Sequence, residues 1–85
     1  MTRADRIRSL LNEALQPSHL DVIDESSRHA GHQPGFDGAG GTHLRVVISA
    51  ESLSPLSRVE RHRRINAILA PEFETGLHAL AIEVK

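Results

Sequence analysis

The chain has 85 residues, a formal net charge of −1 with its histidines neutral, and no cysteine. A chain of this length has enough residues for one compact core, and its small net charge provides no global basic field that would attract nucleic acid. The absence of cysteine fits a reducing, cytoplasmic compartment and excludes a cysteine nucleophile, a disulfide and a cysteine-only zinc or iron–sulfur site, which leaves imidazole and carboxylate as metal ligands.

Residues 4–15 are predicted to form an amphipathic helix, because apolar side chains recur there at helical spacing. Thr2 and Asp5 have the spacing of a capping pair at the start of this helix. The segment lacks the apolar region of a signal peptide, and no run in the chain approaches the roughly 18 apolar residues of a membrane span. We therefore expect a soluble cytoplasmic protein without a membrane partner.

Two strands are expected next, over residues 19–25 and 43–49, because apolar and polar side chains alternate in both segments. Residues 27–41 lie between them and contain five of the chain's six glycines, so no regular element is expected there. A loop of this length is usually either functional or disordered, and both interpretations stay open.

The second half of the chain is predicted to begin with two helices. The first has Ser54 as its N-cap and Pro55 in its first turn, and it continues to about Ala70, where Pro71 stops it. A short helical turn over residues 71–75 is expected to follow.

A last strand is predicted over residues 77–84, after Gly76 as a C-cap, with His78 on its apolar face. The resulting order is α-β-β-α-α-β. It predicts one small α+β domain over residues 1–85, in which helices cover a three-stranded mixed sheet.

Three of the six histidines are candidates for metal chemistry. His29 and His32 form an H-x-x-H in the glycine-rich segment, a spacing that lets two imidazoles approach one metal ion but that often arises by chance. His78 opens the last strand, where its ring either reaches the sheet edge or is buried. Spacing alone leaves that choice open.

The other three histidines are assigned to structure or to solvent. His62 shares the apolar side of its helix with Val59 and Ile65, and it is expected to be buried and hydrogen-bonded. His43 opens a strand on the polar face, and a structural role is favoured for it. His19 is expected to be exposed to solvent.

The helix after Pro55 carries four arginines, namely Arg58, Arg61, Arg63 and Arg64. Their positions spread around the helix, which is more typical of a solvated face than of a DNA-contact stripe. The chain also has no G-x-S-x-G elbow, no HExxH and no phosphate-binding P-loop, so we do not expect an enzyme.

Four segments, in order, are those of a known family: D-E-S-S-R-H-A-G-H at 24–32, T-H-L-R-V-V-I-S at 42–49, R-H-R at 61–63 and G-L-H-A-L-A-I at 76–82. The chain resembles the BolA family essentially from end to end. The resemblance implies a compact α-β-β-α-α-β domain, similar to the class II KH arrangement, with a helix-turn-helix-like element. This agrees with the element order predicted above.

The resemblance also implies a function. The family looks like a partner of monothiol glutaredoxins, with which it forms a heterodimer that bridges a 2Fe-2S cluster, and it is linked to iron regulation and iron–sulfur assembly. In that picture the partner's cysteine and glutathione provide sulfur ligands and the BolA side provides imidazoles. These carry over to His78 and His29, with His32 as a rival to His29, and the isolated chain is expected to hold no cofactor.

Imidazole ligands are chemically reasonable in such a shared cluster. Replacing thiolate by neutral imidazole reduces the negative charge of the cluster and raises its reduction potential, as in Rieske centres. It also makes the ligation sensitive to pH, because free imidazole titrates at about pH 6.5.

Three features depart from the family pattern. The glycine-rich segment is longer than usual, Leu44 stands where phenylalanine is common, and Leu53-Ser54-Pro55 replaces a frequent F-x-G. The first departure bears on the geometry of the loop ligand, whereas the other two concern packing and the start of a helix.

Besides cluster sharing, a second and a third function stay open. Some relatives are described as DNA-binding transcriptional regulators, and DNA binding here would use the helix that carries Arg58, Arg61, Arg63 and Arg64. The third interpretation is a protein–protein adaptor without metal, in which the histidines only pack.

Overall fold

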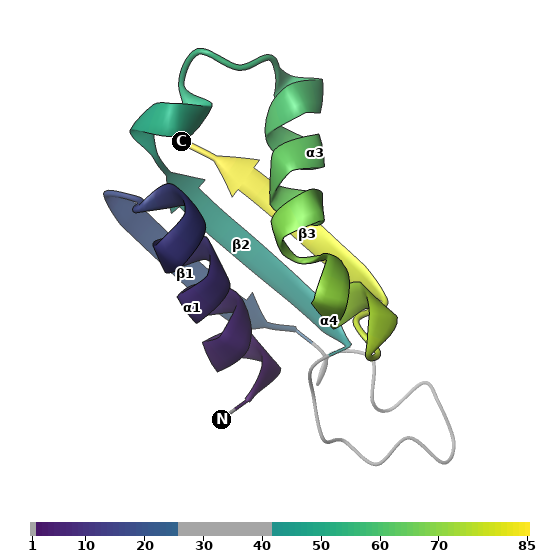
Figure 1. Ribbon diagram of the computed structural model, residues 1–85. Coiled ribbons are helices and arrows are strands. Elements are labelled where there is room, and N and C mark those ends of the chain that lie inside the picture. The colour runs from purple at the N-terminus through teal and green to yellow at the C-terminus, as the bar shows by residue number, and fades with distance from the viewer. Residues whose placement is uncertain (1, 26–41) are drawn as a thin grey trace, which may run out of the picture.

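The computed structural model describes residues 2–25 and 42–85 of the chain, and Figure 1 shows its elements in order. These are α1 (Arg3–Leu15), β1 (His19–Asp24), β2 (His43–Ser49), the 3-10 turn η1 (Glu51–Leu53), α3 (Arg58–Ile68), α4 (Ala70–Glu74) and β3 (Ala79–Val84). The predicted order α-β-β-α-α-β is confirmed. The predicted loop over 27–41 lies outside the described residues.

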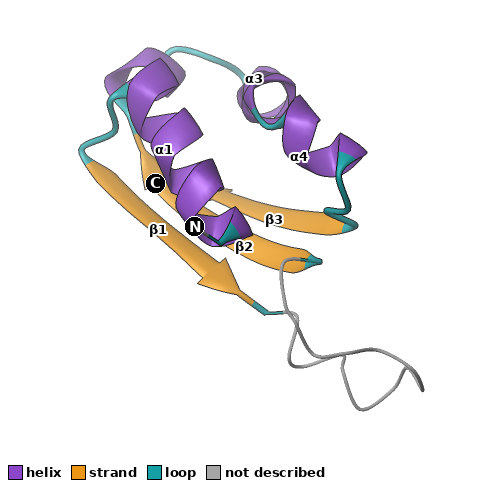
Figure 2. Cartoon of the chain, turned by 60° about the horizontal axis from the view of Figure 1, so that its bottom comes forward, coloured by secondary structure: helices purple, strands orange, loops and turns teal. Residues whose placement is uncertain are grey.

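The three strands form one sheet in the order β1-β2-β3. β1 pairs antiparallel with β2, whereas β2 and β3 are parallel because the chain crosses over through α3 and α4 between them. The helices α1, α3 and α4 lie on one face of this sheet, and no element of the described residues covers the other face (Figure 2). The predicted mixed sheet covered by helices is therefore confirmed.

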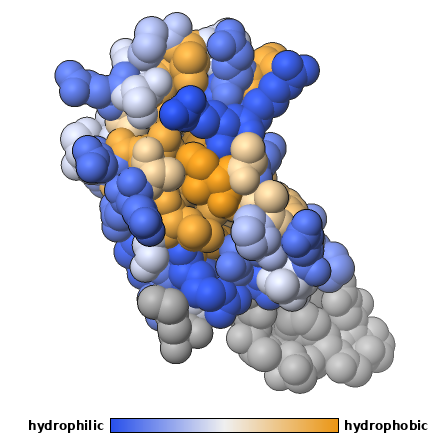
Figure 3. Space-filling view, in the orientation of Figure 1, coloured by the Kyte–Doolittle hydropathy of each residue, from blue (hydrophilic) through white to orange (hydrophobic). Residues whose placement is uncertain are grey.

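The hydrophobic core lies between the helices and the covered face of the sheet. Its buried aliphatic side chains come from every layer, and they include Ile7, Leu11, Leu15, Val22, Leu44, Val46, Ile48, Leu53, Ile65, Leu69 and Leu77. Burying a side chain of this kind contributes roughly 1.5 to 3 kcal/mol. Further apolar side chains gather on the surface between α1 and α3 (Figure 3).

The capping pair predicted for α1 is present. The Thr2 hydroxyl accepts a hydrogen bond from the Asp5 backbone N–H at 3.1 Å, and the Asp5 carboxylate accepts one from the Thr2 backbone N–H at 3.0 Å. Two N–H groups at the helix start are thus satisfied reciprocally. The same bond from the Thr2 backbone lowers the pKa of the Asp5 carboxyl.

The predicted start of α3 is wrong. The helix begins after Ser57, whose hydroxyl accepts a hydrogen bond from the Glu60 backbone N–H at 3.2 Å, and not after Ser54. Ser54 and Pro55 instead lie in the turn between η1 and α3. This turn buries Leu53 completely. The S-x-x-E spacing of Ser57 and Glu60 is itself a capping signal.

Gly76 ends α4 with the backbone dihedral φ at +126°, as a C-cap glycine requires. The Leu77 backbone N–H donates to the Glu72 carbonyl at 3.0 Å, which closes a Schellman-type turn. The predicted start of the last strand at residue 77 was wrong, because β3 begins only at Ala79. Leu77 belongs to the turn and is buried.

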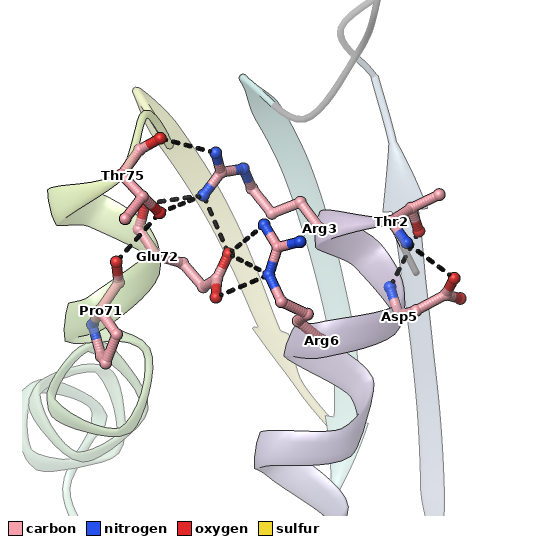
Figure 4. A network of polar contacts seen from close by, with 7 residues as sticks. All are labelled: Thr2, Arg3, Asp5, Arg6, Pro71, Glu72 and Thr75. Carbon is pink, nitrogen blue, oxygen red and sulfur yellow. Dashed lines mark hydrogen bonds and ion pairs between the residues drawn. The ribbon is translucent and has the colours of Figure 1, made fainter.

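Glu72 joins α4 to α1 through two arginines, a contact that the sequence pattern did not predict (Figure 4). Glu72 as a residue is 5% exposed. Arg6 donates to both of its oxygens at 3.0 to 3.2 Å, and Arg3 Nη1 donates to Oε1 at 2.9 Å. Arg3 also donates to the Thr75 carbonyl at 2.9 Å. The α4 turn that precedes His78 is thereby fixed to the start of α1.

Within residues 2–25 and 42–85, no helix has the length and apolar character required to cross a membrane.

Candidate functional site

His78 lies between the buried Leu77 and the first residue of β3, at one end of the sheet. Its backbone N–H donates to the Thr42 carbonyl at 2.9 Å, so its position is set by the start of β2. The residue is exposed, and among the described residues no group forms a hydrogen bond with its ring. The His78 ring is therefore accessible at the surface of the described part of the chain.

His43 lies beside His78 because parallel pairing places the starts of β2 and β3 together. The register pairs His43 with Ala79. The two imidazole rings stack with centroids 6.4 Å apart and an interplanar angle of 29°. His43 Nδ1 lies 3.0 Å from the Thr42 hydroxyl oxygen, and the residue is half-buried. The predicted structural role of His43 agrees with this environment.

Sequence patterns alone did not predict that His43 and His78 lie close together. The sheet topology could have predicted this proximity. Two parallel strands begin at the same end of a sheet, so histidines at the first positions of both strands are brought together. The proximity of His43 and His78 follows only if the strands over residues 43–49 and 77–84 are predicted to pair in parallel.

The segment that contains His29 and His32 begins and ends beside this pair. On its N-terminal side, the Glu25 backbone N–H donates to the His43 carbonyl at 2.8 Å. On its C-terminal side, Thr42 bonds to the His78 backbone. His29 and His32 themselves lie outside the described residues. Their candidacy as ligands remains a prediction.

The described residues alone do not assemble a complete metal centre. Within 2–25 and 42–85, no group of three or more His, Asp or Glu side chains is close enough to hold one ion. His78 has one imidazole neighbour and no carboxylate beside it in that part of the chain. A metal group bound at His78 would therefore need ligands from residues 26–41 or from another molecule.

The prediction for His19 is confirmed, whereas the prediction for His62 is wrong. His19 is exposed as predicted, and its Nε2 lies 3.0 Å from the Asp21 carboxylate. His62 is only half-buried, and no hydrogen bond to its ring is found in the described part of the chain. The predicted burial was wrong because only the second half of α3 packs on the core. Ile65 is fully buried there, whereas Val59 is 58% exposed.

The four arginines of α3 do not form one surface. Arg61 donates to the Leu53 and Ser54 carbonyls, each at 2.8 Å, and so fastens η1 to α3. The other three, Arg58, Arg63 and Arg64, are exposed. The spread around the helix that the sequence predicted is confirmed.

Comparison with known proteins gives consistent matches. The sequence profile described as BolA-like protein matches residues 11–85. A Sinorhizobium sp. protein described as "Uncharacterized protein in cobS 5'region" is 52% identical over 83 residues, which span 98% of this chain and 89% of that protein. The "DNA-binding transcriptional regulator BolA" of Escherichia coli K12 is 36% identical over 78 residues, spanning 92% and 70%.

A solved structure agrees with the fold. The "BolA domain of SufE1 from Arabidopsis thaliana" superposes with a TM-score of 0.86 at 40% sequence identity, covering 100% of this chain and 92% of that one. None of these three descriptions names an enzyme.

Proposed function

The chain belongs to the BolA-like family, and from this membership we propose that it is a non-enzymatic module that shares a 2Fe-2S cluster with a monothiol glutaredoxin and glutathione. The proposed role is iron–sulfur cluster assembly and trafficking or iron-dependent regulation in the cytoplasm. In this proposal the isolated chain holds no cofactor, and the heterodimer with the glutaredoxin completes the site.

One observation carries the proposal. His78 presents an exposed ring at the end of the sheet where the segment with His29 and His32 both starts and finishes. If this chain offers the imidazole of His78 and one further imidazole, from His29 or His32, it has too few ligands to hold a cluster alone. The missing ligands then come from a partner, and thiolates of glutaredoxin and glutathione are the soft donors that iron–sulfur clusters accept.

The residues around His78 hold its backbone in place. Glu72, Arg3 and the Gly76 turn fix the backbone on one side, and the bond to the Thr42 carbonyl fixes it on the other. When bound, a cluster would supply electron-transfer or cluster-transfer chemistry, and His78 would be one of the residues that hold it. The contribution of this chain would be to present the imidazole of His78 as a ligand that the partner lacks.

Anaerobic reconstitution with a monothiol glutaredoxin and glutathione tests the proposal. We expect a visible absorption and circular-dichroism spectrum that differs from that of the glutaredoxin homodimer, and we expect His78→Ala to alter it. His19→Ala is the matched control, because His19 is also exposed but pairs with Ser49 at the other end of the sheet. Parallel His29→Ala and His32→Ala variants decide which of the two is the second ligand.

An unchanged spectrum in His78→Ala would remove His78 from the site. Glutaredoxin binding that needs no cluster and survives all three histidine substitutions would favour a metal-free adaptor instead.

A second candidate function is DNA-binding regulation, which the description of the Escherichia coli relative favours. Exposed Arg58, Arg63 and Arg64 on α3 would then contact phosphates. A sequence-selective gel shift that weakens with salt and is lost on Arg→Ala substitution is the expected result. Arg61 is a poor choice for this test, because it bonds to η1.

A further inference from the structure

Strand β3 has an open outer edge. It pairs with β2 on one side, and no strand within residues 2–25 and 42–85 pairs with its other side. The strand is six residues long and contains neither proline nor lysine between Ala79 and Val84. Proline and charged side chains, lysine above all, commonly protect a sheet edge from pairing with another chain. β3 carries one such side chain, the exposed Glu83, so its edge has little of this protection.

The hydrogen-bond pattern identifies which backbone groups face outward. The Ala79 N–H donates to the Thr42 carbonyl and the Lys85 N–H donates to the Ile48 carbonyl, so odd-numbered residues bond to β2. Alternate residues of a parallel strand bond to the same neighbour. Leu80, Ile82 and Val84 therefore direct their N–H and C=O groups away from β2, along the free edge.

A groove runs between this edge and the start of α3. Its volume is about 270 Å³. Figure 1 places the N-terminal turns of α3 beside the C-terminal end of β3. The side chains and strand residues that line the groove are Arg58, Arg61, His62, Ile82, Glu83 and Val84.

Basic and acidic side chains near the groove lie on opposite faces of the sheet. Arg58, Arg61 and the half-buried His62 line the groove on the helix side, and the His62 ring has no hydrogen-bond partner in the described part of the chain. Glu83 lies on the opposite face of the sheet, because alternate side chains of a strand point to opposite faces. The helix side thus attracts anionic groups and the other side repels them.

We propose that β3 binds an extended, acidic peptide segment of a protein partner, which adds to the sheet as a fourth strand. The segment's backbone bonds to the outward groups of Leu80, Ile82 and Val84. Its alternate side chains that point toward α3 are carboxylates, which meet Arg58 and His62. The side chains between them are uncharged, because they pass Glu83 and the small side chain of Ala81.

The opposite edge of the sheet does not fit this partner. β1 carries exposed Asp21 and Asp24, which repel an acidic segment. The site also differs from the cluster site of the proposed function, since His78 lies at the start of β3 and the groove lies at its end. The two proposals therefore fail or succeed independently.

The test uses the full chain and a synthetic peptide of alternating glutamate and valine, about six residues long to match a typical strand. Amide hydrogen exchange is followed by NMR with and without the peptide. Ala81 and Glu83 are expected to be protected already, because they bond to β2. Leu80, Ile82 and Val84 are expected to exchange faster in the free chain and to become protected when the peptide binds.

Two variants test the charge pattern. Arg58→Glu is expected to weaken peptide binding about tenfold or more, because it reverses the charge that faces the carboxylates. Arg63→Glu is the matched control, since Arg63 lies on the same helix but does not line the groove, and it is expected to leave binding unchanged. Both positions are exposed, so neither variant is expected to affect folding.

A peptide of alternating lysine and valine and a single-stranded oligonucleotide complete the design. Failure of the acidic peptide to protect the three amides would overturn the proposal, as would equal protection by the lysine peptide. Binding of the oligonucleotide at this groove in place of the acidic peptide would also overturn it and would assign Arg58 to nucleic acid.

Discussion

Glu72 is the buried carboxylate on which the contact between α1 and α4 depends. It accepts hydrogen bonds from both Arg3 and Arg6, and the side chain of Arg3 is itself only 14% exposed. Sequence patterns could not reveal this contact, because 69 positions separate Arg3 from Glu72 and only the fold brings them together. By contrast, the Thr2 and Asp5 pair was predictable, because a capping box is local.

Replacing this carboxylate is expected to destabilise the fold. In Glu72→Gln, the guanidinium of Arg3 keeps its charge but loses its buried counter-ion, and we expect the free energy of unfolding to fall by about 2 to 3 kcal/mol. Urea denaturation measures the change. Glu74→Gln on the same helix is the control, because Glu74 is exposed, and an equal loss in both variants would contradict the account.

The same contact predicts a pH dependence. The hydrogen bond from Arg6 is the main cause that lowers the pKa of Glu72 below its ordinary value of 4.5. A lowered pKa adds stability that is fully present above 4.5 and is lost as the pH falls through the lower value in the folded protein. The gap between wild type and Glu72→Gln is thus expected to persist at neutral pH and to shrink in acid. A stability difference between wild type and Glu72→Gln that widens below pH 4.5 would refute this role of Glu72.

At the scale of elements, the turn after α4 determines where His78 is presented. Gly76 has a backbone dihedral φ of +126°, and a Cβ atom there would approach Arg3 Nη2 to 3.1 Å. Gly76→Ala is expected to cost about 1 to 2 kcal/mol, because an L-residue is strained at this dihedral. Thermal unfolding measures the loss. A semisynthetic chain with D-alanine at this position, which favours positive φ, is expected to recover most of it.

The elements also show where sequence reasoning succeeded and where it failed. The strand over residues 43–49 was predicted with its observed limits, because apolar residues at 44, 46 and 48 alternate there with polar residues at 43, 45 and 49. The start of α3 and the burial of His62 were wrong. Helical periodicity identifies an apolar face, but only packing decides how many turns of that face meet the core, and here the first turns extend along the edge beside β3.

At the scale of the whole molecule, parallel pairing of β2 with β3 brings together chemistry that is distant in sequence. It places His78 beside His43 and beside both ends of the segment with His29 and His32. The fold class and the family could be inferred from element order and four short segments. The geometry of the candidate site could not, because it depends on which strand ends share one edge of the sheet.

The central claim is that this chain supplies imidazole to a cluster that a glutaredoxin and glutathione complete. Its most direct test is pulsed EPR of the reduced heterodimer, with nitrogen-15 histidine in this chain alone. The account predicts nitrogen-15 hyperfine coupling to the cluster in the wild type and in His19→Ala, and a reduced coupling in His78→Ala. The absence of any such coupling in a wild-type heterodimer that holds an intact cluster would contradict it.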